Sequence, residues 1–182
     1  MALLIFGIVL WWAAHLFKRL APGPRAALGA RGKGLVALVL VASVVLMIFG
    51  FKGANYIHVW APPAPMVHLN NTLMVLALFF TSPGPRKGAL FYRMRHPQLF
   101  GFSLWAVAHL LVNGDLASVM LFGSLLIWAG VEVALINKAE PEWTPGPKGT
   151  FSKGLMFHAI SVLLVGVIGY IHGLVGPSPF PG

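Results

Sequence analysis

The sequence predicts an all-α protein, a polytopic transmembrane bundle of about six helices whose N-terminus lies outside the cytoplasm. Three observations support this fold class. Hydrophobic residues make up 58% of the 182 residues and charged residues only 9%, which is too few to cover the surface of a soluble domain. The hydrophobic residues form six runs separated by polar loops. The basic residues concentrate in alternate loops.

Six apolar runs are candidates for crossing a hydrocarbon core of roughly 30 Å. They are Ala2–Phe17, Gly34–Phe51, Leu69–Phe80, Pro97–Val112, Leu116–Ile136 and Leu155–Val175. The first, third and fourth runs are short, so their helices are expected to include flanking residues or to lie where the bilayer is thinner. We treat the chain as a single transmembrane domain spanning residues 1–182.

The distribution of basic residues orients these runs. Of the 13 lysines and arginines, all but Lys52 lie in the loops after the first, third and fifth runs. Cytoplasmic loops of membrane proteins carry an excess of these residues, so the N-terminus is expected on the opposite side. The net charge of +9 does not indicate nucleic-acid binding, because the basic residues form no continuous patch.

The chemistry available inside such a bundle depends on histidines and one glutamate. The chain has seven histidines and no cysteine, which excludes disulfides, cysteine-bound zinc and thiolate-bound iron. Ionisable groups within a bilayer are costly and are therefore candidates for function. The predicted topology places His15, His96, Glu132 and His158 toward the inner side and His109 toward the outer side.

Haem b is the cofactor that this inventory suggests, because two neutral imidazoles facing a bundle interior are its usual axial ligands. His15 and His158 lie at similar predicted depth on different helices, which makes them the candidate pair of iron ligands. The alternative interpretation is that individual histidines only bond water or backbone at the interface. Glu132 would then only extend to the inner surface or pair with a histidine.

The turn Asn113-Gly114-Asp115 joins the fourth and fifth runs on the outer side. Asp115 is expected to cap the fifth helix by accepting hydrogen bonds from its first N–H groups. Asn113 and Gly114 are expected to supply the positive φ values that tight turns often need. These structural roles explain the three residues without catalysis.

One long ordered block of residues resembles the NnrU family. It comprises Arg95-His96-Pro97-Gln98, Trp105, Ala108-His109-Leu110-Leu111, Asn113-Gly114-Asp115 and Leu121-Phe122-Gly123. His15, Pro24-Arg25, Arg31-Gly32 and Trp60-Ala61-Pro62-Pro63 extend the resemblance over residues 10–130. The family is named for a membrane protein linked to the expression of nitrite and nitric oxide reductases in denitrifying bacteria.

The resemblance implies an accessory factor of nitrite and nitric oxide respiratory metabolism in the bacterial inner membrane. The expected partners are the lipid bilayer, haem b and respiratory membrane proteins. The resemblance does not establish whether the protein is an enzyme. A histidine-lined channel or carrier without a cofactor is a further hypothesis, which no pattern in the sequence specifically favours.

An alternative function comes from a plant and cyanobacterial relative, 15-cis-zeta-carotene isomerase, which is similar in the RHPQ and AH blocks and uses haem b. That similarity implies His15 as an axial ligand. The position matching the second ligand lies near Phe122, which cannot bind iron, so His158, His96 or His109 would have to replace it. The alternative is therefore haem-dependent cis–trans isomerisation of carotenoids or similar polyenes.

Overall fold

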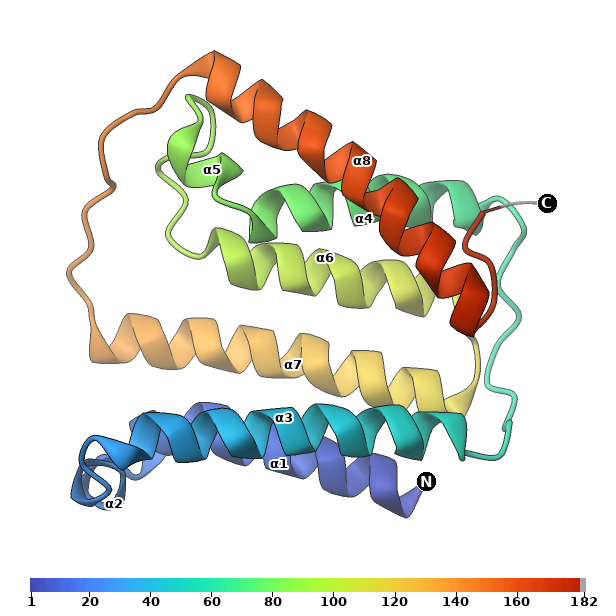
Figure 1. The fold of residues 1–182 in the computed structure, drawn as a ribbon, viewed down its shortest axis with the longest axis horizontal. Coiled ribbons are helices and arrows are strands. Elements are labelled where there is room, and N and C mark those ends of the chain that lie inside the picture. The colour runs from blue at the N-terminus through green and yellow to red at the C-terminus, as the bar shows by residue number, and fades with distance from the viewer. Residues whose placement is uncertain (181–182) are drawn as a thin grey trace. The chain divides into compact units, whose positions relative to one another are not determined.

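The computed structural model describes residues 1–180, and these form eight helices and no β-strand (Figure 1). In chain order the helices are α1 (Ala2–Leu20), α2 (Pro22–Ala27), α3 (Arg31–Lys52), α4 (Met66–Thr81), α5 (Gly84–Lys87), α6 (Pro97–Val112), α7 (Leu116–Ala139) and α8 (Phe151–Val175). The prediction of an all-α protein is confirmed.

Four of these helices, α1, α3, α7 and α8, are long and apolar enough to cross a membrane. Helices α4 and α6 are also apolar but have 16 residues each. Large hydrophobic side chains remain exposed on the long helices, for example Leu163 at 69%. Such surfaces require a lipid environment, so the chain is a multi-pass membrane protein.

Each predicted run lies within one of these six helices, and most of the helices extend beyond the predicted ends. Helix α4 begins at Met66, three residues before the predicted start at Leu69. Pro65 precedes it with φ −63°, a value already suited to a helix. The helices α2 and α5 were not predicted, and both begin at a Pro-Gly-Pro-Arg sequence.

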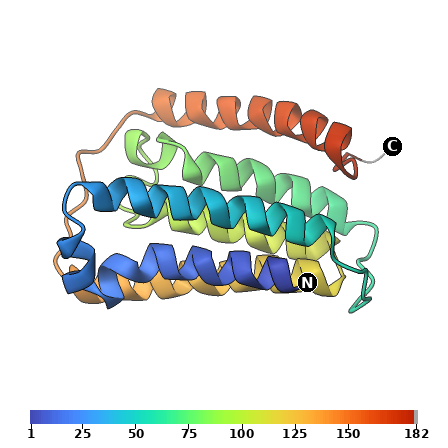
Figure 2. The same ribbon diagram turned by 60° about the horizontal axis from the view of Figure 1, so that its bottom comes forward.

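The residue contacts divide the chain into two compact units, which are described separately. The first unit comprises Met1–Trp60 and Gly114–Ala139 and contains α1, α2, α3 and α7. Helices α1 and α3 run alongside each other (Figures 1 and 2). They are antiparallel, because Leu4 lies against Gly50 while Gly7, further along α1, lies against the earlier Met47.

Helix α7 packs against α1 in the same direction. The indole Nε1 of Trp12 donates a hydrogen bond of 3.1 Å to Ser124 Oγ. One turn further along both helices, the rings of His15 and Trp128 are in contact. The apolar core of this unit lies among α1, α3 and α7 and comprises Leu4, Ile8, Met47 and Ala117.

The second unit comprises Ala61–Asn113 and the chain from Glu140 onward, and it contains α4, α5, α6 and α8. Helices α4 and α6 are antiparallel, with Ala77 opposite Gly101 and the Asn70 side-chain amide 3.0 Å from the Ala108 carbonyl oxygen. Helix α8 packs against α4 and α5. The unit therefore holds an α4–α6 pair against which the last helix is packed.

Candidate functional site

His15 has a defined orientation within the first unit. Its Nδ1 lies 3.0 Å from the carbonyl oxygen of Trp11, four residues earlier on α1. A carbonyl oxygen can only accept a hydrogen bond, so Nδ1 must donate and carry the proton. In the neutral imidazole, Nε2 then keeps its lone pair and is the atom able to bind a metal or accept a hydrogen bond.

Two indole rings hold the imidazole of His15 in place. The ring centroid of His15 lies 4.2 Å from that of Trp11 and 4.5 Å from that of Trp128 on α7. The two indoles also contact each other edge to face, at 5.2 Å. This packing restricts the rotation of the imidazole, so that the direction of Nε2 is set by tertiary contacts.

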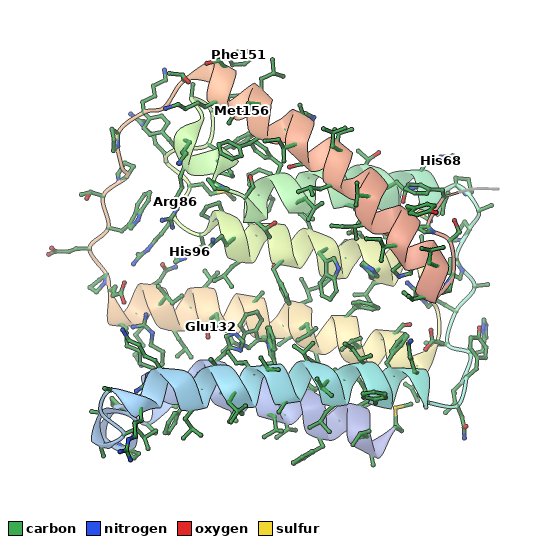
Figure 3. All side chains as sticks on the ribbon, viewed as in Figure 1. His68, Arg86, His96, Glu132, Phe151 and Met156 are labelled. Carbon is green, nitrogen blue, oxygen red and sulfur yellow. The ribbon has the colours of Figure 1, made fainter. Side chains whose placement is uncertain are left out.

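Glu132 lies one turn beyond Trp128 on α7 and is labelled in Figure 3. Its side chain is buried, with a relative exposure of 7%. The carboxyl group interacts electrostatically with Arg19, which lies one turn beyond His15 on α1. The first unit thus contains two successive polar layers, one at His15 and one at Arg19 and Glu132.

His109 repeats the local geometry of His15 in the second unit. Its Nδ1 lies 2.9 Å from the carbonyl oxygen of Trp105, again four residues earlier on the same helix. The two rings of this pair have centroids 5.0 Å apart. The same argument therefore places the proton of a neutral His109 on Nδ1 and the lone pair on Nε2.

The two histidines share a six-residue pattern, Trp-x-x-Ala-His-Leu, at residues 11–16 and 105–110. The alanines of the pattern, Ala14 and Ala108, are both buried. The sequence prediction treated the two histidines separately and did not use this repeat. The pattern is visible in the sequence and would have identified the common geometry.

The other predicted ligands lie in the second unit. His158 lies on α8, and its ring centroid is 5.9 Å from that of Phe79 on α4. His96, which Figure 3 labels, is the residue immediately before α6. The first residue of that helix, Pro97, is buried. The neighbouring Arg95 donates a hydrogen bond to the carbonyl of Glu140.

The predicted pairing of His15 with His158 stays a prediction, because the two residues belong to different units. Within residues 1–180, no group of three or more histidine, aspartate or glutamate side chains could hold a metal ion.

The turn before α7 has the predicted cap but not the predicted backbone. Asp115 Oδ1 accepts a hydrogen bond of 3.0 Å from the Ser118 N–H, which confirms the cap. The prediction of positive φ at Asn113 and Gly114 was wrong, since Gly29 is the only residue of the described chain with positive φ. Asn113 is extended, with φ −124°. Glycine is needed at 114 because a Cβ there would lie 1.8 Å from the Trp60 carbonyl oxygen.

Replacing Asp115 with alanine is expected to destabilise the protein by about 1–2 kcal/mol. The carboxylate also accepts a hydrogen bond from the hydroxyl of Ser118, which is fully buried and would lose its partner. The measurement is the thermal denaturation temperature of the purified protein in detergent. Asp115→Asn keeps one acceptor oxygen, so its denaturation temperature should fall less than that of Asp115→Ala. An equal fall in both variants would contradict a capping role.

The comparisons with known proteins agree with the resemblance seen in the sequence. The model of the NnrU family, described as NnrU protein, matches residues 3–179. The match extends beyond residues 10–130 at both ends and includes α8 with His158. No curated protein and no solved structure matches the chain. Because the family model covers almost the whole sequence, the chain belongs to the NnrU family.

Proposed function

We propose that this NnrU-family protein binds haem b through His15 and acts as an accessory factor in nitrite and nitric oxide respiratory metabolism. The observation that carries the haem part is the geometry of His15. A ligand imidazole needs its proton on one ring nitrogen and a lone pair on the other, and the Trp11 carbonyl sets this arrangement. This orientation of the His15 imidazole supports the proposal.

The surrounding residues contribute to such a site in distinct ways. The carbonyl of Trp11 accepts a hydrogen bond from Nδ1 of His15. This bond makes the Nε2 lone pair a stronger electron-pair donor to a metal. Trp11 and Trp128 contact the His15 ring and restrict its rotation. Haem b, when bound, supplies a redox-active iron. Three histidines are candidates for the second iron ligand: His109, His158 and His96. Of these, His109 has the same Nδ1 hydrogen bond to a tryptophan carbonyl as His15.

The test is an absorption spectrum of the protein purified in detergent from haem-replete cells, oxidised and reduced. We expect a Soret band that His15→Ala abolishes, because no other group replaces Nε2 at that position. His58→Ala is the matched control, since His58 is exposed and, among residues 1–180, its side chain bonds only Tyr56, at 3.5 Å. The same measurement on His109→Ala, His158→Ala and His96→Ala identifies the second ligand.

A colourless wild-type protein, or a His15→Ala protein with an unchanged Soret band and haem content, would contradict haem ligation by His15. The metabolic role is tested separately by deleting the gene in its host and measuring nitrite and nitric oxide consumption. Wild-type and His58→Ala genes should restore consumption and His15→Ala should not. Unchanged consumption after deletion would rule out the accessory role while leaving the spectral result intact.

The proposal includes six membrane crossings of a bacterial inner membrane, with the N-terminus outside. Its support is the direction of helices within each unit. In the first, α7 is parallel to α1 and α3 is antiparallel to it; in the second, α6 and α8 are both antiparallel to α4. Six alternating crossings require these directions. At about 1.5 Å per residue, the 16 residues of α4 and α6 cover about 24 Å and need a thin bilayer.

Reporter fusions test this topology. Alkaline phosphatase, which is active only outside the cytoplasm, should be active when fused after Ala54 and inactive when fused after Gly146. Green fluorescent protein should show the opposite pattern at the two positions. The basic residues predict this result, because the loop that contains Gly146 belongs to the basic side. Phosphatase activity at Gly146 would overturn the orientation.

A further inference from the structure

The second unit contains a cavity of about 300 Å³ that the sequence did not predict. It lies between α4, α5, the loop that follows α5, and the first two turns of α8. Four phenylalanines, Phe79, Phe80, Phe91 and Phe151, contribute to its lining. Figure 3 labels Phe151 at the start of α8, and its side chain is 65% exposed, so the cavity reaches the surface of the unit.

Packed rings and touching backbones form the walls of this cavity. The rings of Phe79 and Phe80 have centroids 5.4 Å apart, and those of Phe80 and Phe91 are 5.0 Å apart, each in an edge-to-face arrangement. The backbones of α5 and α8 meet at two glycines, where a Cβ on Gly88 would lie 3.1 Å from the Cα of Gly154. Walls of this kind are largely pre-formed, as in small-molecule sites.

His158 is the only polar side chain among the residues lining the cavity. Its ring contacts Phe79 at a centroid distance of 5.9 Å. Unlike His15 and His109, it does not bond a carbonyl on its own helix, and within residues 1–180 neither of its ring nitrogens has a hydrogen-bond partner. The His158 side chain is exposed, so its ring nitrogens are accessible to the hydrogen-bonding group of a ligand that enters the cavity.

We propose that this cavity binds the ring of a lipid-soluble quinone or quinol, with one ring oxygen hydrogen-bonded to His158. A flat ring packs well against phenylalanine rings, and its oxygen supplies the partner that the imidazole lacks. The apolar tail leaves along the exposed hydrophobic face of α8, which includes Leu155 and Leu163. The site does not depend on haem binding at His15.

Two other occupants fit these observations less well. An acyl chain of a phospholipid would fill the space but would leave His158 without a partner. A tetrapyrrole is a poorer fit, because a volume of about 300 Å³ is at the small end of ligand pockets and suits a single substituted ring. Both alternatives are separate outcomes of the experiment.

The experiment uses the full chain in phosphatidylcholine nanodiscs and an azido-ubiquinone photoprobe, with crosslinked peptides identified by mass spectrometry. We expect crosslinks within residues 79–91 or 151–158 that excess unlabelled ubiquinone removes. His158→Ala should weaken labelling about tenfold, the equivalent of one hydrogen bond. His158→Gln, which keeps a hydrogen-bond donor, should retain most of the labelling. His172→Ala, on the same helix but outside the cavity lining, should leave it unchanged.

A second variant, Ala89→Phe, tests the cavity independently of the histidine. Ala89 lines the cavity, so a phenyl ring there should occupy the space and abolish labelling. Size-exclusion chromatography confirms that each variant is folded. The His15→Ala protein should label like wild type, which separates this result from the haem proposal.

Three results would overturn the quinone site. One is labelling that neither His158→Ala nor Ala89→Phe reduces. Another is competition by phosphatidylglycerol but not by ubiquinone, which would assign the cavity to a lipid acyl chain. The third is loss of the Soret band in His158→Ala, which would make His158 a haem ligand.

Discussion

Replacing Gly50 with alanine is expected to destabilise the first unit by about 3 kcal/mol. The added Cβ would lie 2.3 Å from the backbone nitrogen of Leu4 and 2.6 Å from its Cα. Both are backbone atoms, so no side-chain rotation relieves the contact, and α1 and α3 must separate. Separation also opens the apolar core that Leu4 forms with Ile8 and Met47. The measurement is thermal denaturation in detergent, followed by circular dichroism.

Gly34→Ala is the matched control on the same helix. A Cβ on Gly34 has no neighbour within 4 Å, so the only effect is the higher helix propensity of alanine. This variant should be as stable as wild type or slightly more stable. If Gly50→Ala and Gly34→Ala melt at the same temperature, close packing at Gly50 does not hold α1 against α3.

Replacing Gly114 with alanine should have a similarly large effect, on the order of 3 kcal/mol. Its Cβ would lie 1.8 Å from the carbonyl oxygen of Trp60. The Gly114 carbonyl also accepts hydrogen bonds from the N–H groups of Val59 and Trp60, at 2.8 and 3.0 Å. A displacement at Gly114 therefore breaks both bonds, and with them the bridge between His58 and Asp115.

The destabilisation caused by Gly114→Ala is measured by thermal denaturation and by limited proteolysis of residues 53–60. Proteolysis should accelerate in Gly114→Ala, because the segment loses the hydrogen bonds that tie it to the start of α7. Gly130→Ala is the control, since a Cβ there meets nothing within 4 Å. Wild-type proteolysis rates in Gly114→Ala would show that the turn tolerates a side chain.

The six apolar helices, four long and two shorter, could be predicted because hydrophobicity and length are local properties of the chain. Their ends were less certain, and α4 begins at Met66 because Pro65 supplies a suitable φ. Helices α2 and α5 were missed. They have six and four residues, too few to show a helical period, and their Pro-Gly-Pro-Arg sequences are also typical of turns.

The candidate site could be predicted only as a set of residue types. The sequence singled out His15, His109 and Glu132 because ionisable groups are costly in a bilayer. It did not reveal that both histidines donate Nδ1–H to a tryptophan carbonyl, although the repeated Trp-x-x-Ala-His-Leu pattern contains that information once the segments are helical. It also did not reveal that Trp128 packs on His15, because that contact joins α7 to α1.

The sequence by itself determined that this protein is helical, apolar enough to require a membrane, and related to the NnrU family. Those properties follow from composition and from the order of residues along the chain. Only the tertiary structure decided why residue 114 is glycine and where His158 lies. Trp60 and the aromatic wall around His158 come from distant segments, and whether a side chain has room or a partner depends on packing between them.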